Sequence, residues 1–482
     1  MKHFFVIVTS LLLFTACGAG NDTELEPAQL FELETAGEDF PVSGPPNFDA
    51  SYHYLSVPEN WEKPSSQNIR LPVVIIRAAQ GGSDLPPVMM VVGGPGIGDM
   101  SAAAYASAYP WTAERDFIIF GQRGTEHASP ALMCPEYNDA IAKELSERVS
   151  ALKNCRDRLT SDGMDLDQYH SLAISRDIDA LRQAIGVQSI SLYGLSYGTR
   201  VALTYAREFP EQVSSMVLDS VLPHTAKYDD TGLQNYFEAL QRISDICDSE
   251  PACAAAYPNS AQRYLSALED AAEAPWDNSA FNPERPDVTI DDLASIVGID
   301  SEYEVSIAPA LMSAIANRDL ETINSFLSAS AGSNLAWGMR LSVWCSEAFA
   351  HSEFVRSGHQ AGGTFSDIQS SVFTAEECEA WNVSTRPDAE IAPTQSDIPV
   401  LLISGELDAA TPPWMADEAS TTLPNSRFIV LKGGLHTETT RWDGDGCAMS
   451  IAGQFFRDHE TVLKQPEFEC LNNRRNAEFY VE

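Results

Sequence analysis

Short apolar runs alternate with amphipathic stretches along the first half of the chain. Two stretches, residues 173–186 and 199–206, repeat apolar side chains every three or four positions, which is typical of helices packed on one face. The apolar runs are bounded by turn residues and fit buried strands. They cover Ile69–Arg77, Val88–Val92, Phe117–Phe120, Ser189–Tyr193 and Met216–Asp219. This α/β order predicts a mostly parallel, doubly wound sheet with helices on both faces.

The strand pattern stops near Tyr228 and resumes after Pro393. Candidate helices in between are Leu233–Cys247, Ala261–Ala272 and Ile307–Ser328, and the next strands are Pro399–Ile403 and Arg427–Leu431. We therefore expect a core built from residues 51–227 and 394–482. A helical cap, residues 228–393, is inserted between them and lies above the sheet.

The N-terminus reads as a targeting segment over residues 1–17. Lys2 is followed by the apolar run Phe4–Phe14, which is too short to span a membrane. The run ends in a sequence that resembles a bacterial lipobox, so Cys17 is a candidate lipidation site. The alternative is an ordinary secretory signal, and both alternatives predict export, to the cell envelope or the medium. Residues 18–50 are acidic and rich in Pro and Gly, which predicts a flexible tether.

The charge balance limits the partners. The 482 residues include 30 basic and 69 acidic side chains, a formal net charge of −39. Such a surface repels nucleic acid and anionic lipid, so we expect no nucleic-acid partner. We expect membrane contact only through a lipid on Cys17. We otherwise expect the protein to be a monomer.

Nine cysteines are present, and eight remain once Cys17 is set aside. They lie as neighbouring pairs: Cys134 and Cys155, Cys247 and Cys253, Cys345 and Cys378, Cys447 and Cys470. In an oxidising compartment this predicts four disulfides, although eight cysteines allow 105 pairings. There is no Cys-x-x-Cys spacing and no histidine cluster, so we expect no metal.

A candidate nucleophile lies in Gly194-Leu195-Ser196-Tyr197-Gly198. The pentapeptide fits Gly-x-Ser-x-Gly between a predicted strand and a predicted helix, which is the setting of a nucleophile elbow. Its glycines allow a sharp turn that exposes the Ser196 hydroxyl at the top of the sheet. The alternative is an ordinary strand-to-helix turn with a capping serine.

Two later strands supply candidate partners for this serine. Asp408 follows the strand at residues 399–403 and His436 follows the strand at residues 427–431, which gives the order serine, acid, histidine. We expect His436 to take the Ser196 proton and Asp408 to orient the imidazole. Glu406 is the rival acid, and a turn aspartate with a loop histidine is the alternative without catalysis. The backbone N–H groups of Tyr197 and Gly94 are the expected oxyanion hole.

Together these motifs resemble the proline iminopeptidase and tripeptidyl aminopeptidase group of α/β-hydrolases, peptidase family S33, and within it the exported tripeptidyl aminopeptidase-like branch. The matching stretches, spread over most of residues 50–480, are Gly93–Gly96, Gln122–Thr125, Ser175–Arg182, Gly194–Gly198, Val217–Asp219, Ser342–Glu347, Gly405–Pro413 and Gly434–His436. The resemblance implies an α/β-hydrolase core with a helical cap and a TAP-like C-terminal region, no cofactor, and peptide substrates. Two positions depart from the family pattern: Gly121 replaces the usual Asp, and Val92 replaces the His found in many iminopeptidases.

The resemblance also implies that Glu347, on the cap, meets the free amine of a peptide. The alternative is a surface glutamate on a helix anchored by Cys345. Three functions remain open: a serine aminopeptidase, an esterase or other small-molecule hydrolase, and a catalytically silent binding lipoprotein. The intact serine, acid and histidine favour the first two, and the resemblance favours the aminopeptidase.

Overall fold

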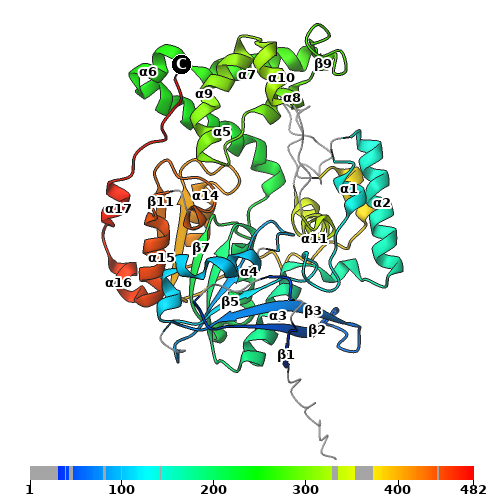
Figure 1. Ribbon diagram of the computed structural model, residues 1–482, viewed down its shortest axis with the longest axis vertical. Coiled ribbons are helices and arrows are strands. Elements are labelled where there is room, and N and C mark those ends of the chain that lie inside the picture. Colours follow the sequence, from blue (N-terminus) through cyan, green and yellow to red (C-terminus); the bar gives the residue numbers. More distant parts are fainter. Residues whose placement is uncertain are drawn as a thin grey trace, which may run out of the picture. The chain divides into compact units, whose positions relative to one another are not determined.

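The computed structural model describes residues 31–481, apart from 38–39, 43–46, 80–82, 99, 142, 328–334, 353–372 and 442–443 (Figure 1). The predicted signal peptide and Cys17 lie outside the described residues. None of the helices in the described part is long and apolar enough to cross a membrane.

A nine-stranded sheet forms the centre of the fold, in the order β1-β2-β3-β5-β4-β6-β7-β10-β11. The strands are β1 Leu33–Thr35, β2 Ala50–Pro58, β3 Asn68–Ile76, β4 Val88–Val91, β5 Phe117–Phe120, β6 Ile190–Leu195, β7 Val213–Asp219, β10 Val400–Gly405 and β11 Ser426–Leu431. The first four strands in this order pair antiparallel, and the pairs from β5 to β11 are parallel. The prediction of a mostly parallel sheet is confirmed.

Helices cover both faces of the sheet. Successive side chains of a strand point to opposite faces, so each central strand packs against helices on both sides. In β10, Val400 and Leu402 belong to the apolar cluster that includes α3 (Ser171–Ile185) and α4 (Tyr197–Glu208). Leu401 and Ile403 face the other way and belong to the cluster of α15 (Cys447–Arg457). The central strands are apolar throughout because both of their faces are buried.

The cap predicted over residues 228–393 divides into two parts. The first part has its own apolar core, which also contains Leu407 and Leu435, the neighbours of the candidate acid and histidine. Its helices are α5 Tyr228–Ser249, α6 Pro251–Ala256, α7 Ser260–Glu273, α8 Ile290–Ile296, α9 Glu302–Ala316 and α10 Leu320–Phe326. The second part, α11 (Trp337–Val343), a π-helical turn (Trp344–Ala348) and α13 (Ala375–Trp381), packs into the core cluster of α3 and α4.

Three local expectations need correction. The tether cannot extend over all of residues 18–50, because Leu33–Thr35 pairs with β2 as an edge strand. The cap contains a small hairpin of β8 (Trp276–Asp277) and β9 (Asp287–Val288). The helix expected over residues 307–328 is two helices, since Arg318 between them has a φ of 55°, in the left-handed region that ends helices.

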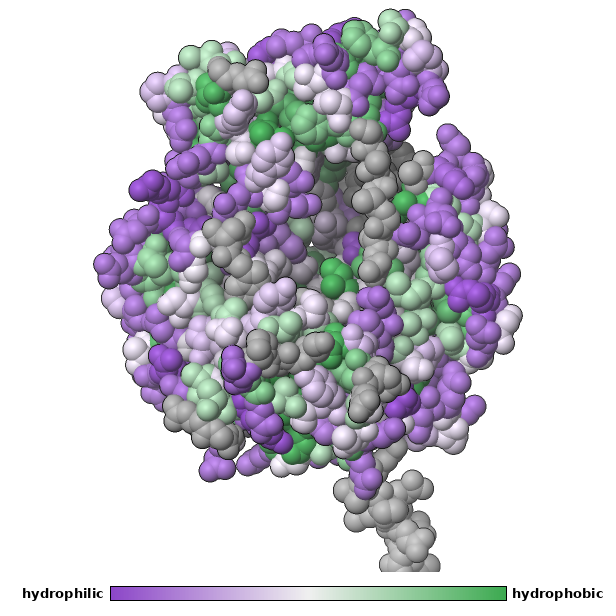
Figure 2. All heavy atoms as spheres, viewed as in Figure 1, coloured by the Kyte–Doolittle hydropathy of each residue, from purple (hydrophilic) through white to green (hydrophobic). Residues whose placement is uncertain are grey.

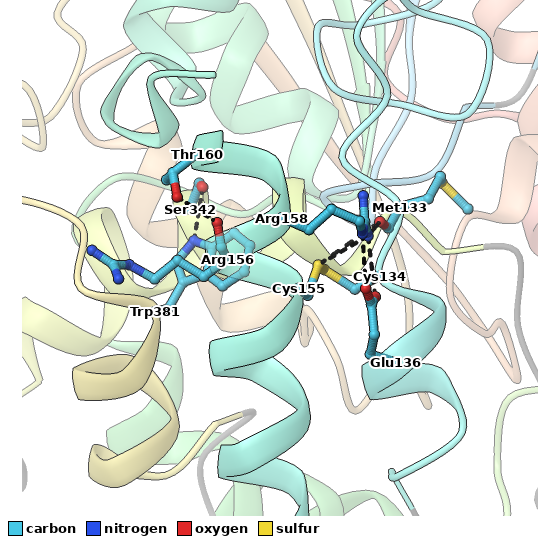
Figure 3. The surroundings of a disulfide bond; sticks show 9 residues. All are labelled: Met133, Cys134, Glu136, Cys155, Arg156, Arg158, Thr160, Ser342 and Trp381. Carbon is cyan, nitrogen blue, oxygen red and sulfur yellow. Dashed lines mark hydrogen bonds and ion pairs between the residues drawn. A yellow bond between two sulfur atoms is a disulfide. The ribbon is translucent and has the colours of Figure 1, made fainter. Parts of the chain in front are cut away.

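Four disulfides join the cysteines that the sequence pairs as neighbours: Cys134–Cys155, Cys247–Cys253, Cys345–Cys378 and Cys447–Cys470. Cys134 precedes α1 (Pro135–Asn138) and Cys155 lies in α2 (Leu145–Ser161). Figure 3 shows Arg158 beside this disulfide, where it bonds Glu136 at 2.8 Å. The bonds fit export to an oxidising compartment. Hydrophilic side chains cover most of the face drawn in Figure 2, as the acidic composition predicts.

Candidate active site

The predicted nucleophile elbow is present at the junction of β6 and α4. Ser196 lies between them with φ 54° and ψ −125°, a strained conformation for a residue with a side chain. A Cβ on Gly198 would lie 1.9 Å from the Val91 carbonyl oxygen, so only glycine fits there. The Ser196 N–H donates to the Asp219 carbonyl at 2.9 Å, which ties the elbow to the end of β7.

The loop after β4 lies directly against Ser196. A Cβ on Gly93 would be 2.6 Å from the Ser196 Cβ, and Gly94 has a φ of 112°. Within the described part of the chain, no hydrogen bond occupies the N–H of Gly94 or of Tyr197, the two predicted oxyanion donors. The loop is held from the cap, because Arg340 Nη1 donates to the Gly94 carbonyl at 2.7 Å.

Asp408 and His436 meet at the carboxyl ends of β10 and β11. His436 Nδ1 lies 2.9 Å and 3.0 Å from the two carboxylate oxygens of Asp408. Thr411 donates to the same carboxylate through its N–H at 2.9 Å and its hydroxyl at 2.8 Å. Glu406, the rival acid, instead accepts a hydrogen bond from the Gly433 N–H at 2.8 Å. Of the two acids, the structure therefore pairs Asp408 with the imidazole.

The electrostatics favour a charged pair. Burial opposes ionisation of Asp408, but the charge and hydrogen bond of His436 outweigh it and lower the pKa of the carboxyl. Burial likewise opposes the charged imidazole, yet Asp408 raises the pKa of His436 above its usual value. The acid is 1% exposed, so water does not screen this interaction.

Glu347 does not face the site as a free carboxylate. It is 6% exposed and accepts hydrogen bonds from the Ser171 hydroxyl at 2.7 Å and Arg200 Nε at 3.1 Å. The Ser171 N–H also donates to it, and the Ser171 hydroxyl contacts the Tyr197 hydroxyl at 2.8 Å. Both Glu347 oxygens are therefore hydrogen-bonded within the protein, where they fix α4 to the start of α3, and the amine-binding role of Glu347 stays a prediction.

The two departures from the family pattern are accommodated by packing. A Cβ on Gly121 would lie 2.7 Å from Pro72 of β3, which leaves no room for a side chain. The carbonyl of Val92 accepts a hydrogen bond from Gln122 at 2.9 Å. Arg123 and Asp177, both fully buried, form a two-pronged ion pair at 2.6 Å and 2.7 Å. This ion pair joins the segment after β5 to α3 in the interior of the protein.

Sequence reasoning missed three residues around the histidine. Thr411 fixes the Asp408 carboxylate, as described above. Ser220 has a φ of 61°, and its hydroxyl accepts a hydrogen bond from the Thr437 N–H at 2.7 Å. Asp219 lies in the matching stretch Val217–Asp219, but no role was predicted for it, and its side chain contacts a residue 220 positions later. No local pattern signals such contacts.

A parallel sheet flanked by helices, with a serine elbow after β6 and an acid–histidine pair after β10 and β11, defines an α/β-hydrolase fold. Comparison with family models agrees: residues 86–246 match the alpha/beta hydrolase fold and residues 365–465 match the TAP-like protein family. The chain thus has an α/β-hydrolase fold and a region that matches TAP-like proteins.

Similar curated proteins include the serine protease Hip1 of Mycobacterium tuberculosis, 26% identical over 41% of this chain and 42% of that protein. The match therefore spans less than half of the relative. The tripeptidyl aminopeptidase of Streptomyces coelicolor is 24% identical over 78% of this chain and 75% of its own length. Among solved structures, the proline iminopeptidase of Mycobacterium smegmatis covers 85% of this chain and 99% of its own, with 14% identity and a TM-score of 0.42.

Proposed function

We propose that this protein is a serine peptidase that hydrolyses peptides from a free N-terminus through Ser196, His436 and Asp408. The observation that carries the proposal is the Asp408–His436 pair, whose histidine loop is hydrogen-bonded to Ser220 and to Asp219, the residue that also accepts the Ser196 N–H. The names of the similar proteins, a serine protease and an aminopeptidase, support peptides as the substrate class.

In the proposed reaction His436 takes the proton of the Ser196 hydroxyl as the oxygen attacks the scissile carbonyl. The N–H groups of Gly94 and Tyr197 bind the oxyanion that forms. His436 then protonates the leaving amine, and water hydrolyses the acyl-enzyme by the same steps. Asp408 stabilises the imidazolium throughout and keeps its own charge.

With Glu347 occupied, we propose Asp300 as the carboxylate that meets the substrate amine. It precedes α9 in the cap, its side chain is exposed, and none of the described residues bonds its carboxylate. Partial burial raises the pKa of Asp300, the charges of Glu304 and Asp408 raise it further, and His436 and Arg441 lower it, which supports a position near the candidate site. A carboxylate there offsets the cost of bringing an ammonium beneath the cap.

The nucleophile is tested with Ser196→Ala. The variant should fold normally and lose fluorophosphonate labelling and peptide cleavage by several orders of magnitude, with only a residual rate from binding and the oxyanion hole. Retention of even a tenth of the wild-type rate would place the nucleophile elsewhere.

The free-amine requirement is tested by comparing a tripeptide amide with its N-acetylated form. A charge-assisted hydrogen bond contributes about 1.5–3 kcal/mol, so acetylation should lower kcat/KM by about 10- to 100-fold. Asp300→Asn should narrow this gap, whereas Glu302→Gln, an exposed control on the next helix, should leave it unchanged. Equal cleavage of both substrates by the wild type would exclude the aminopeptidase and favour an esterase or endopeptidase.

We also propose that the protein is exported. The four disulfides support this, and Cys17 remains a predicted lipid anchor. Globomycin-sensitive processing with labelled palmitate would test the anchor, and a Cys17→Ala variant that still incorporates label would refute it.

A further inference from the structure

Asp219 is fully buried at the carboxyl end of β7, the strand between β6 and β10. Its backbone carbonyl accepts the Ser196 N–H, and its side chain reaches the loop that carries the histidine. There, Asp219 Oδ2 accepts the Thr439 N–H at 2.7 Å and the Thr439 hydroxyl at 2.6 Å. One residue thus joins the elbow to the histidine loop.

Neighbouring contacts strengthen this junction. The Thr439 hydroxyl also contacts the Tyr193 hydroxyl of β6 at 2.6 Å. Ser220, next to Asp219, accepts the Thr437 N–H and hydrogen-bonds Asp408. His436 therefore lies just before a short segment, residues 437–439, that is held at both ends by the end of β7.

The choice of an acid at this position is costly for the fold. Asp219 Oδ1 is buried and has no hydrogen-bond partner among the described residues. The pKa of Asp219 is raised to about 6, because burial, helped by the charge of Glu438, outweighs the lowering effect of the Thr439 hydrogen bonds and of His436. Glu438 itself is bonded to the Leu435 N–H and to Arg474. An asparagine could accept the same Thr439 N–H without a buried charge. We therefore expect the negative charge of Asp219 to have a function.

We infer that Asp219 is a positioning residue that holds the His436 loop against the Ser196 elbow and, through its negative charge, stabilises the His436 imidazolium formed during the reaction. The His436 ring is bonded to Asp408 and not to Asp219. Asp219 therefore acts by holding the loop and by the electrostatic effect of its charge on the ring. This inference rests on the proposed triad but not on the peptide specificity.

The test is Asp219→Asn, assayed on a small activated ester and on a peptide amide. Both substrates need the same histidine, so kcat should fall by about 10- to 100-fold on both while KM changes less than about threefold. Because an anion nearby favours the imidazolium, its removal should also move the acidic limb of kcat/KM to lower pH. Asp219→Glu, which keeps the charge, should leave that limb closer to the wild-type pH.

The matched control is Ser215→Ala, a buried polar residue on the same strand; among the described residues its hydroxyl bonds Ser191 alone, at 3.0 Å. It should change the melting temperature without moving the pH profile. The inference is overturned if Asp219→Asn resembles this control, with an unchanged acidic limb and wild-type kcat. Should Asp219→Asn fail to fold, Thr439→Val tests the same link, and an unchanged kcat there would also overturn it. Failure of the triad itself would be recognised separately, by fluorophosphonate labelling of Ser196→Ala.

Discussion

Asp408→Asn removes the charge beside His436 and keeps almost the same shape. Both Asp408 oxygens lie within 3.0 Å of His436 Nδ1, and Asp408 is 1% exposed. The single Nδ1–H is shared between these oxygens, and a charge-assisted hydrogen bond contributes about 1.5–3 kcal/mol, so kcat should fall by at least about 10- to 150-fold. The amide also presents an N–H group to Nδ1, which favours the wrong imidazole tautomer.

The loss should depend on pH in a defined direction. Burial alone lowers the pKa of His436, and Asp408 is the main charge that raises it. Without that charge the imidazole stays neutral to lower pH, so the acidic limb of kcat/KM should move to lower pH. Steady-state rates on a peptide amide and an activated ester between pH 4 and pH 9 would measure both effects.

Glu406→Gln is the control for this experiment. Glu406 is two residues away and bonds the Gly433 N–H, an acceptor role that glutamine retains. Its rate should remain within a few-fold of wild type. A larger loss in Glu406→Gln than in Asp408→Asn, or an Asp408→Asn variant with more than a tenth of wild-type activity, would refute the assignment of the acid.

Three further predictions follow from named contacts. Arg340→Met should lower kcat on a small ester more than it raises KM, because the Gly94 carbonyl loses its donor at 2.7 Å; an unchanged kcat would show that the loop holds itself. Unfolding without reductant should leave all eight paired cysteines closed to alkylation, and removal of Cys345–Cys378, which closes the longest loop at 33 residues, should cost about 2–4 kcal/mol. Two or more alkylated cysteines would contradict the pairing. Asp219 has a folded pKa of about 6 against 3.8 for an unperturbed aspartate, so its contribution to the free energy of unfolding should fall by about 3 kcal/mol as pH rises from about 3 to 7. Denaturation of wild type and Asp219→Asn across that range measures this contribution. If the free energy of unfolding changed with pH equally in both proteins, the prediction would be wrong.

Local patterns were sufficient for the sheet and the elbow. Strands such as β5, Phe-Ile-Ile-Phe, are buried on both faces and carry their signal in consecutive residues. The glycines around Ser196 are required by close backbone contacts, and those contacts follow from the turn itself. The order of serine, acid and histidine also predicted the Asp408–His436 pair, because neighbouring parallel strands bring their carboxyl ends together.

The direction of the Glu347 side chain depended on information that no local pattern carries. Glu347 lies in a π-helical turn, Trp344–Ala348, where the extra residue changes the face on which each side chain lies. Its partner Arg200 is 147 positions earlier in the chain. A carboxylate beside a buried guanidinium pairs with that charge, and the motif match alone did not predict this pairing.

The two parts of the cap contact the candidate site in different ways. The part formed by α5–α10 has a separate apolar core, whereas α11 is built into the main core and touches the oxyanion loop directly. The Ala336 N–H donates to the Gly96 carbonyl at 3.0 Å, and a Cβ on Gly96 would lie 2.7 Å from the Ala336 carbonyl oxygen. Together with the Arg340 bond, this contact fixes the loop from above, while Gly93 fixes it against Ser196 from below. A shift of α11 would therefore displace the proposed oxyanion donor, so this half of the cap must stay rigid for catalysis. The α5–α10 part, which carries Asp300, packs instead against Leu407 and Leu435, the neighbours of Asp408 and His436.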